Sequence, residues 1–112
     1  MGKRSIYVTI YKTETGRICG FVVREHAKND VCAAVSLLVL NTVNSIECLT
    51  QDRFICDYDK SGGYLSFLHP ALASGGESHD ASLLLDSLAL GLYGVKDEYG
   101  KDIHITEEVR HD

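Results

Sequence analysis

The sequence predicts an α+β fold: a two-layer sandwich in which one mostly antiparallel sheet is covered by two helices, in the order ββαββαβ. Short segments that alternate apolar and polar residues predict strands, and two long apolar segments without such alternation predict helices. A sheet and its covering helices enclose one core between two layers. The 112 residues suffice for one such core, so we expect a single domain over residues 1–112.

The first hairpin is expected over residues 5–12 and 18–24. In its first strand, isoleucine and valine at every second position alternate with tyrosine and threonine, which is typical of a strand with one buried face. The turn between the strands contains Gly16, which can adopt the positive φ that tight turns need.

The later elements are predicted in the same way, strands from alternating residues and helices from longer segments without alternation. A helix is expected over residues 31–49, and its beginning, VCAAVSLLVL, carries no charge. A second hairpin is expected over residues 53–58 and 64–68, with a turn in which Asp59 can form an Asx-type bond. A second helix is expected from about Ser78 to Tyr99, closed by Gly100. A last edge strand is expected from Ile103, Ile105 and Val109.

Cys32 and His26 are the candidate catalytic pair. Cys32 falls in the first turn of the first predicted helix, where unpaired backbone N–H groups and the positive end of the helix dipole favour a thiolate. His26 lies six residues upstream at a strand end, so a short connection can bring its imidazole, a natural proton acceptor, back to the sulfur. The alternative for Cys32 is a buried structural cysteine, which is the commoner role of a free thiol.

Three neighbouring residues are candidate supporting groups. Asp30 can cap the helix or orient His26, although one side chain cannot easily do both. The backbone N–H of Ala33, with that of Cys32, can hold an oxyanion. Ser36 lies one turn after Cys32 and is expected either to bond within the site or to bond back to the i−4 carbonyl.

These residues resemble the ribosomal-processing cysteine protease (Prp) family. The matching pieces are His26-Ala27 and the stretch VCAAVS at residues 31–36, and the turn at residues 59–63 also looks similar. The resemblance implies a cytoplasmic bacterial endopeptidase that removes an N-terminal extension from a large-subunit ribosomal protein, with the histidine and cysteine as its dyad. The chain differs from the pattern in having Glu25 in place of a glycine and a shorter loop after it. We expect this short loop, residues 27–30, to be ordered and cleavage to be less sequence-selective.

Composition limits the partners of this chain. The net charge of −5, with basic residues scattered along the chain, argues against direct nucleic-acid binding. The four cysteines lack C-x-x-C spacing, so we expect free thiols, no metal and no cofactor. The N-terminus lacks a signal-like apolar region, and no stretch is expected to reach the ~20 apolar residues of a membrane span, so we expect no membrane span and a cytoplasmic location.

The apolar surface of the first predicted helix exceeds what one sheet can cover. We therefore expect a homodimer in which Leu38 and Leu40 lie at the interface, unless the second helix packs alongside and suffices. Two alternative functions remain open: a catalytically weak or inactive homodimer that binds a peptide or a ribosome-assembly partner, and a purely structural homodimer with buried cysteines. Core or half-buried packing is expected for Cys19, Cys48 and Cys56, and surface positions for His69, His79, His104 and His111.

Overall fold

The computed structural model describes residues 5–25 and 30–110. The elements are, in chain order, β1 (Ile6–Lys12), β2 (Ile18–Glu25), α1 (Asp30–Leu49), β3 (Ile55–Tyr58), β4 (Tyr64–Leu68), α2 (Pro70–Ala73), α3 (His79–Tyr99), the 3₁₀ turn η1 (Gly100–Asp102) and β5 (Ile103–Val109). The predicted order of long elements, ββαββαβ, is confirmed. The short α2 and η1 were not predicted, because segments of three or four residues show no periodicity.

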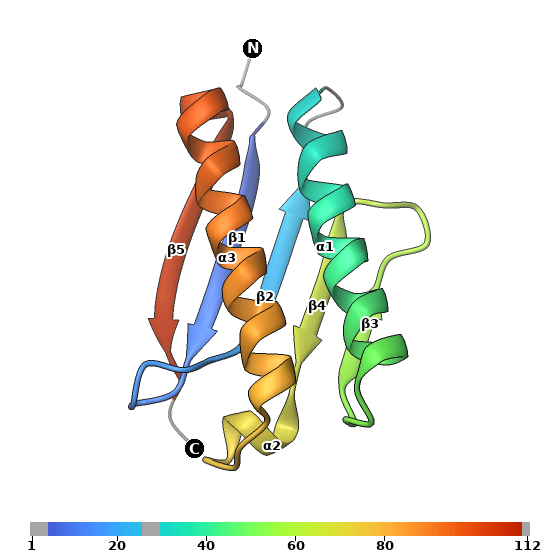
Figure 1. The fold of residues 1–112 in the computed structure, drawn as a ribbon. Helices are drawn as coiled ribbons and strands as arrows, with labels where there is room; N and C mark the ends of the chain where they lie inside the picture. Colours follow the sequence, from blue (N-terminus) through green and yellow to red (C-terminus); the bar gives the residue numbers. More distant parts are fainter. Residues whose placement is uncertain (1–4, 26–29, 111–112) are drawn as a thin grey trace.

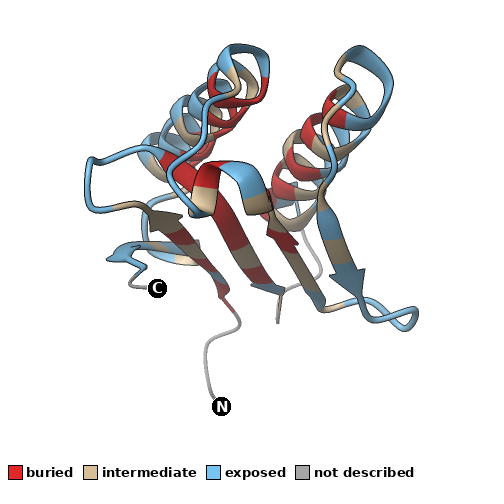
Figure 2. Ribbon diagram, turned by 90° about the horizontal axis from the view of Figure 1, so that it is seen from below, coloured by how far each residue is buried: buried red, intermediate tan, exposed pale blue. Residues whose placement is uncertain are grey.

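One five-stranded sheet, in the order β3-β4-β2-β1-β5, forms the first layer. The pairs β1–β2, β2–β4 and β3–β4 are antiparallel, whereas β5 runs parallel to β1. Helices α1 and α3 lie side by side on one face of this sheet, which confirms the two-layer prediction (Figures 1 and 2).

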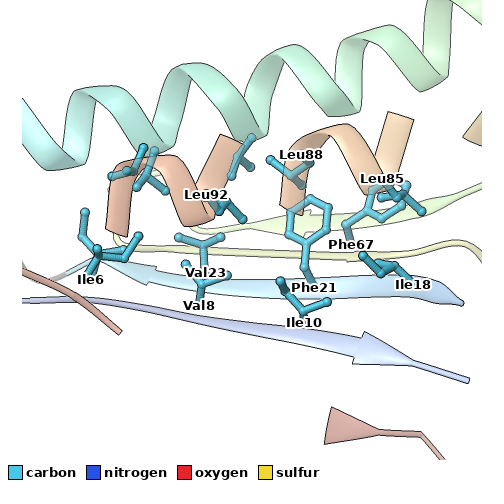
Figure 3. Packing of buried hydrophobic residues seen from close by; sticks show 14 of the residues in the cluster. Ile6, Val8, Ile10, Ile18, Phe21, Val23, Phe67, Leu85, Leu88 and Leu92 are labelled. Carbon is cyan, nitrogen blue, oxygen red and sulfur yellow. The ribbon is translucent and has the colours of Figure 1, made fainter. Parts of the chain in front are cut away.

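The hydrophobic core lies between the sheet and the two helices. Figure 3 shows Leu85, Leu88 and Leu92 of α3 above side chains of β1, β2 and β4. Phe21 of β2 stacks on Phe67 of β4, with ring centroids 5.2 Å apart. The buried residues of α1 recur every three or four positions, the spacing of one helix face, and are Val31, Val35, Val39, Thr42 and Ile46.

The two long helices pack against each other, which accounts for part of the apolar surface of α1. Leu38 is half-buried, and its methyl carbons would lie 3.1 and 3.2 Å from a Cβ added at Gly91 of α3. The expectation that Leu38 lies on a free face is therefore wrong. Leu37 and Leu40 remain exposed, at 72% and 51%.

Helix α1 is long and apolar enough to cross a membrane, by length and composition alone. The expectation that no segment reaches this length and hydropathy is therefore wrong. One face of α1 nevertheless packs on the sheet as part of the core, and core helices meet the same criteria of length and composition.

Several predicted turns and helix ends are confirmed. Gly100 ends α3 with φ 56°, and its N–H donates to the carbonyl of Lys96. Asp59 Oδ1 accepts from the backbone N–H of Ser61 at 3.0 Å, the predicted Asx-type bond. Ser78 caps α3 by accepting from the N–H of Ala81.

His69 is buried, at 1% exposure, so the prediction of a surface position is wrong. Its Nδ1 accepts from the N–H of Leu72 at the start of α2, and its Nε2 lies 2.8 Å from Asp52 Oδ2. The same carboxylate oxygen accepts from the hydroxyl of Ser78. These contacts, which we call the Asp52 cluster (Asp52, His69 and Ser78), join the segment after α1 to the starts of α2 and α3.

The other cysteine and histidine predictions have mixed outcomes. Cys19 is buried and Cys56 is half-buried, as predicted, but Cys48 is exposed near the end of α1. His79 and His104 are exposed, as predicted, whereas His111 lies outside the described residues.

Candidate active site

Cys32 lies in the first turn of α1, as predicted. The helix begins at Asp30, one residue earlier than expected, so Cys32 is its third residue and Asp30 lies within the first turn instead of before it. The carboxylate of Asp30 thus faces the positive end of the helix dipole, which is favourable. Cys32 is half-buried and Ala33 is exposed. Cys32 and Ala33 are the third and fourth residues of α1, so the i−4 position of each precedes the helix.

Glu25, at the end of β2, contacts both Cys32 and Ser36. The hydroxyl of Ser36 donates to Glu25 Oε1 at 2.9 Å, and the thiol of Cys32 donates to Oε2 at 3.3 Å. Ser36 thus bonds to Glu25, beside Cys32, and its role as a supporting residue stays a prediction. Sequence reasoning did not identify Glu25 as a site residue. A signal was present, because Glu25 alternates with Val23 and Phe21, which point toward the helices.

The backbone of Glu25 is fixed on both sides. It pairs with Ile6 of β1, and its N–H donates to the carbonyl of Gly63 at 3.0 Å. Gly63 has φ 91°, a conformation that other residues rarely adopt, and a Cβ there would lie 3.4 Å from the Glu25 carbonyl oxygen. The turn of the second hairpin therefore holds the end of β2 beside the beginning of α1.

A groove of about 360 Å³ lies between α1 and the β3–β4 hairpin, and Glu25 and Ser36 line it. Its apolar lining comes from α1, β2 and the hairpin, and includes Val39, Leu40, Val43, Tyr58, Tyr64 and Leu65. Asn44 and Asp59 add polar groups. Cys32 does not line the groove itself but lies one helical turn before Ser36. The groove therefore lies next to the turn of α1 that carries Cys32.

Cys56 also lines the groove but is a poor nucleophile. Burial of its thiol, and secondarily the charge of Asp57, raises the pKa of Cys56 above the ordinary value. A raised pKa keeps the sulfur protonated near neutral pH, and the thiol is less reactive than the thiolate.

His26 lies outside the described residues, as do the loop positions 27–29, so the expected dyad and ordered loop stay predictions. Asp30, the last position of that predicted loop, belongs to α1. Within residues 5–25 and 30–110, no cluster of histidine, cysteine and carboxylate side chains is suited to a metal ion.

Comparisons with known proteins show to which family the chain is similar. The family model described as cysteine protease Prp matches residues 5–104. The ribosomal processing cysteine protease Prp of Bacillus subtilis (strain 168) is 26% identical over 85 residues, which cover 76% of each chain. Its counterpart from Staphylococcus aureus (strain NCTC 8325 / PS 47) is 28% identical over 107 residues, which cover 89% of this chain and 96% of that one.

Solved structures show the same fold. The crystal structure of the essential ribosomal processing protease Prp from S. aureus, in complex with a covalently linked product peptide, has a TM-score of 0.82 and 26% identity. The match covers 92% of this chain and 99% of that one. SMU.848 from Streptococcus mutans, at 23% identity, has a TM-score of 0.80 over 95% of this chain and 96% of that one. With a family model that matches residues 5–104, the chain belongs to the cysteine protease Prp family.

Proposed function

We propose that this protein is a cysteine endopeptidase that removes the N-terminal extension of a large-subunit ribosomal protein. The observation that carries the proposal is the position of Cys32 in the first turn of α1, beside a groove, in a chain that belongs to the Prp family. The S. aureus relative is a ribosomal processing protease whose structure holds a covalently linked product peptide, which supports a peptide as substrate.

In the proposed mechanism, His26 takes the thiol proton of Cys32 and the sulfur attacks the carbonyl carbon of the scissile bond. The carbonyl oxygen becomes an oxyanion, which the backbone N–H groups of Cys32 and Ala33 stabilise. His26 then gives its proton to the leaving amine, and a water molecule hydrolyses the thioester that remains on Cys32. Asp30 and Ser36 are supporting residues: Asp30 orients His26, and Ser36 bonds within the site.

The charge of the groove suits a basic substrate segment. Glu25 and Asp59 line it, and no lysine or arginine of the described residues does. The whole chain has a net charge of −5, which would attract a basic peptide at low salt.

Replacement of the proposed dyad tests this function. Cys32→Ala and Cys32→Ser should each abolish cleavage of a peptide that contains the N-terminal extension, while circular dichroism shows an unchanged fold. His26→Ala should slow both cleavage and the alkylation of Cys32 by iodoacetamide. Cys48→Ser removes an exposed thiol outside the site and should leave cleavage unchanged. Cleavage by either Cys32 variant would refute the assignment of the nucleophile.

A second candidate is a catalytically weak or inactive family member that binds the same peptide. The carboxylate of Glu25 favours it, because a negative charge 3.3 Å from the sulfur opposes thiolate formation. Peptide binding by the wild-type protein without turnover, measured by calorimetry and mass spectrometry, would support this candidate against the first.

We also propose that the protein is a cytoplasmic homodimer. Leu37 on α1 and Leu90 on α3 are 72% and 77% exposed, so both helices keep apolar side chains outside the core. Leu37→Asp should then convert a dimer to a folded monomer in light scattering, whereas Leu38→Asp should instead disturb the contact with α3. A monomeric wild type would exclude the dimer, and cell fractionation tests the location.

A further inference from the structure

We propose that Glu25 is a positioning residue for Cys32: its carboxylate keeps the side chain oriented and protonated, and so restrains the reactivity of the thiol. The proposal deepens the proposed function, since it concerns the same nucleophile. The reactivity of Cys32 can nevertheless be measured without any substrate peptide.

The two oxygens of Glu25 meet two donors that lie one helical turn apart. Ser36 holds Oε1 at 2.9 Å, and this bond directs Oε2 toward the sulfur of Cys32 at 3.3 Å. An ionised carboxylate accepts hydrogen bonds and has no proton to donate. In the contact with an ionised Glu25, the hydrogen between the two atoms therefore belongs to the sulfur, and Cys32 must be a thiol.

The backbone that carries this carboxylate is held in place. The backbone of Glu25 is held by the pairing with Ile6 and by the hydrogen bond to Gly63, and the side chain is half-buried. Cys32 and Ser36 lie on the same face of α1, so the helix presents both donors to the end of β2 at once. The acceptor and its two donors therefore all belong to regular elements of the fold.

Loss of the thiol proton would place two negative charges about 3.3 Å apart. The positive end of the α1 dipole favours the thiolate, and Glu25 opposes it. Among the residues that the structure describes, the other ionisable groups in the first turn of α1 and along the groove are Asp30, Cys56, Tyr58, Asp59 and Tyr64, and none of these carries a positive charge. Because the site is partly open to solvent, we expect removal of the Glu25 charge to increase the thiolate fraction about three- to tenfold.

Alkylation of the full-length protein by iodoacetamide tests this inference. The sulfur–carbon bond forms, the carbon–iodine bond breaks, iodide leaves and the thiol proton passes to the buffer. In Glu25→Gln, the amide oxygen can still accept from Ser36 and the amide N–H can donate to the sulfur. We expect alkylation of Cys32 to be about three- to tenfold faster near neutral pH, with the midpoint of its pH profile shifted to lower pH.

Two variants and two internal thiols serve as controls. Glu98→Gln removes one charge from an exposed position on α3 and should leave the rate unchanged. Glu25→Asp keeps the charge and should keep the slow rate, as a rescue by the conservative change. Peptide mapping by mass spectrometry measures the alkylation of each cysteine separately. The exposed Cys48 is the reference thiol, and the buried Cys19 reacts only if the fold opens.

An unchanged or slower rate at Cys32 in Glu25→Gln would overturn the proposal. If that variant also exposes Cys19, then Glu25→Asp decides: a rate near that of the wild type supports the restraint, and a rate as fast as in Glu25→Gln overturns it. A faster Cys32 in a protein that cleaves no peptide would support the role of Glu25 while refuting the proposed protease function. The two failures are therefore distinguishable.

Discussion

Removal of the Asp52 carboxylate should destabilise the fold far from the candidate active site. Asp52 accepts from the buried His69 and from Ser78, so it joins the segment after α1 to the starts of α2 and α3. His69 Nδ1 accepts from Leu72, which means that the proton of the neutral ring lies on Nε2 and points at Asp52. Asp52→Ala leaves this N–H without its acceptor.

The expected magnitude follows from these contacts. A buried donor that loses its partner costs about 1–3 kcal/mol, and a loosened helix cap costs about 0.5–1 kcal/mol. The side chain of Asp52 is 26% exposed, so water can reach the vacated position and reduce the cost. We therefore expect a loss of about 2 kcal/mol in the free energy of unfolding and a fall of about 8 °C in Tm.

Urea unfolding followed by circular dichroism measures this loss, with thermal unfolding as a second probe. Asp57→Ala is the matched control, because it removes a carboxylate of the same kind from an exposed position on the edge strand β3. It should change the free energy of unfolding by less than about 0.5 kcal/mol. If Asp52→Ala is no less stable than Asp57→Ala, the Asp52 cluster does not stabilise the fold and the reasoning is refuted.

Three further predictions concern the acid stability of Asp52, the glycines of α3 and the Tyr93–Glu107 pair. The hydrogen bonds from Ser78 and His69 lower the pKa of Asp52. The ionised carboxylate therefore contributes its full stability above about pH 4, and this contribution is lost as the pH falls through the folded pKa. Acid unfolding of Asp52→Asn should lack this pH-dependent loss of stability. Gly94→Ala should raise the free energy of unfolding by about 0.5–1 kcal/mol, because nothing lies within 4 Å of the added Cβ. Gly91→Ala should gain less, because its Cβ meets Leu38 at 3.1 Å, and an equal gain in urea unfolding would contradict that packing. The hydrogen bond to Glu107 raises the pKa of Tyr93 to about 12, so ultraviolet titration should show a late tyrosine transition that Glu107→Gln moves to lower pH. A late transition that persists in that variant would show another cause.

Local patterns were sufficient to predict most elements of the fold. The alternation of side chains along β1 and the glycines at the turns can both be recognised from residues that are neighbours in the sequence. The limits of α1 and α3 were predicted to within one residue, because their first turns and the glycine after α3 carry local signals. The short helix α2 was missed because four residues are too few to show a period.

The burial of His69 and the contacts of Leu38 were mispredicted for a common reason. A histidine before a proline looks like a loop residue, and its burial depends on Asp52, which is 17 positions away. Leu38 was expected to be free because the position of α3 beside α1 cannot be read from the sequence of α1. Both outcomes depend on which faces meet after the chain has folded.

By itself, the sequence determined the class of fold, the Prp resemblance and the placement of Cys32 at the beginning of a helix, because each of these depends on residues close together in the chain. Only the tertiary structure decided that β5 pairs in parallel with β1 and that Glu25 holds Cys32 and Ser36. Glu25 is 11 positions from Ser36, and their contact requires β2, α1 and the Gly63 turn to be packed together. Such contacts form only when elements that are distant in the sequence pack together, and local sequence patterns do not encode this packing.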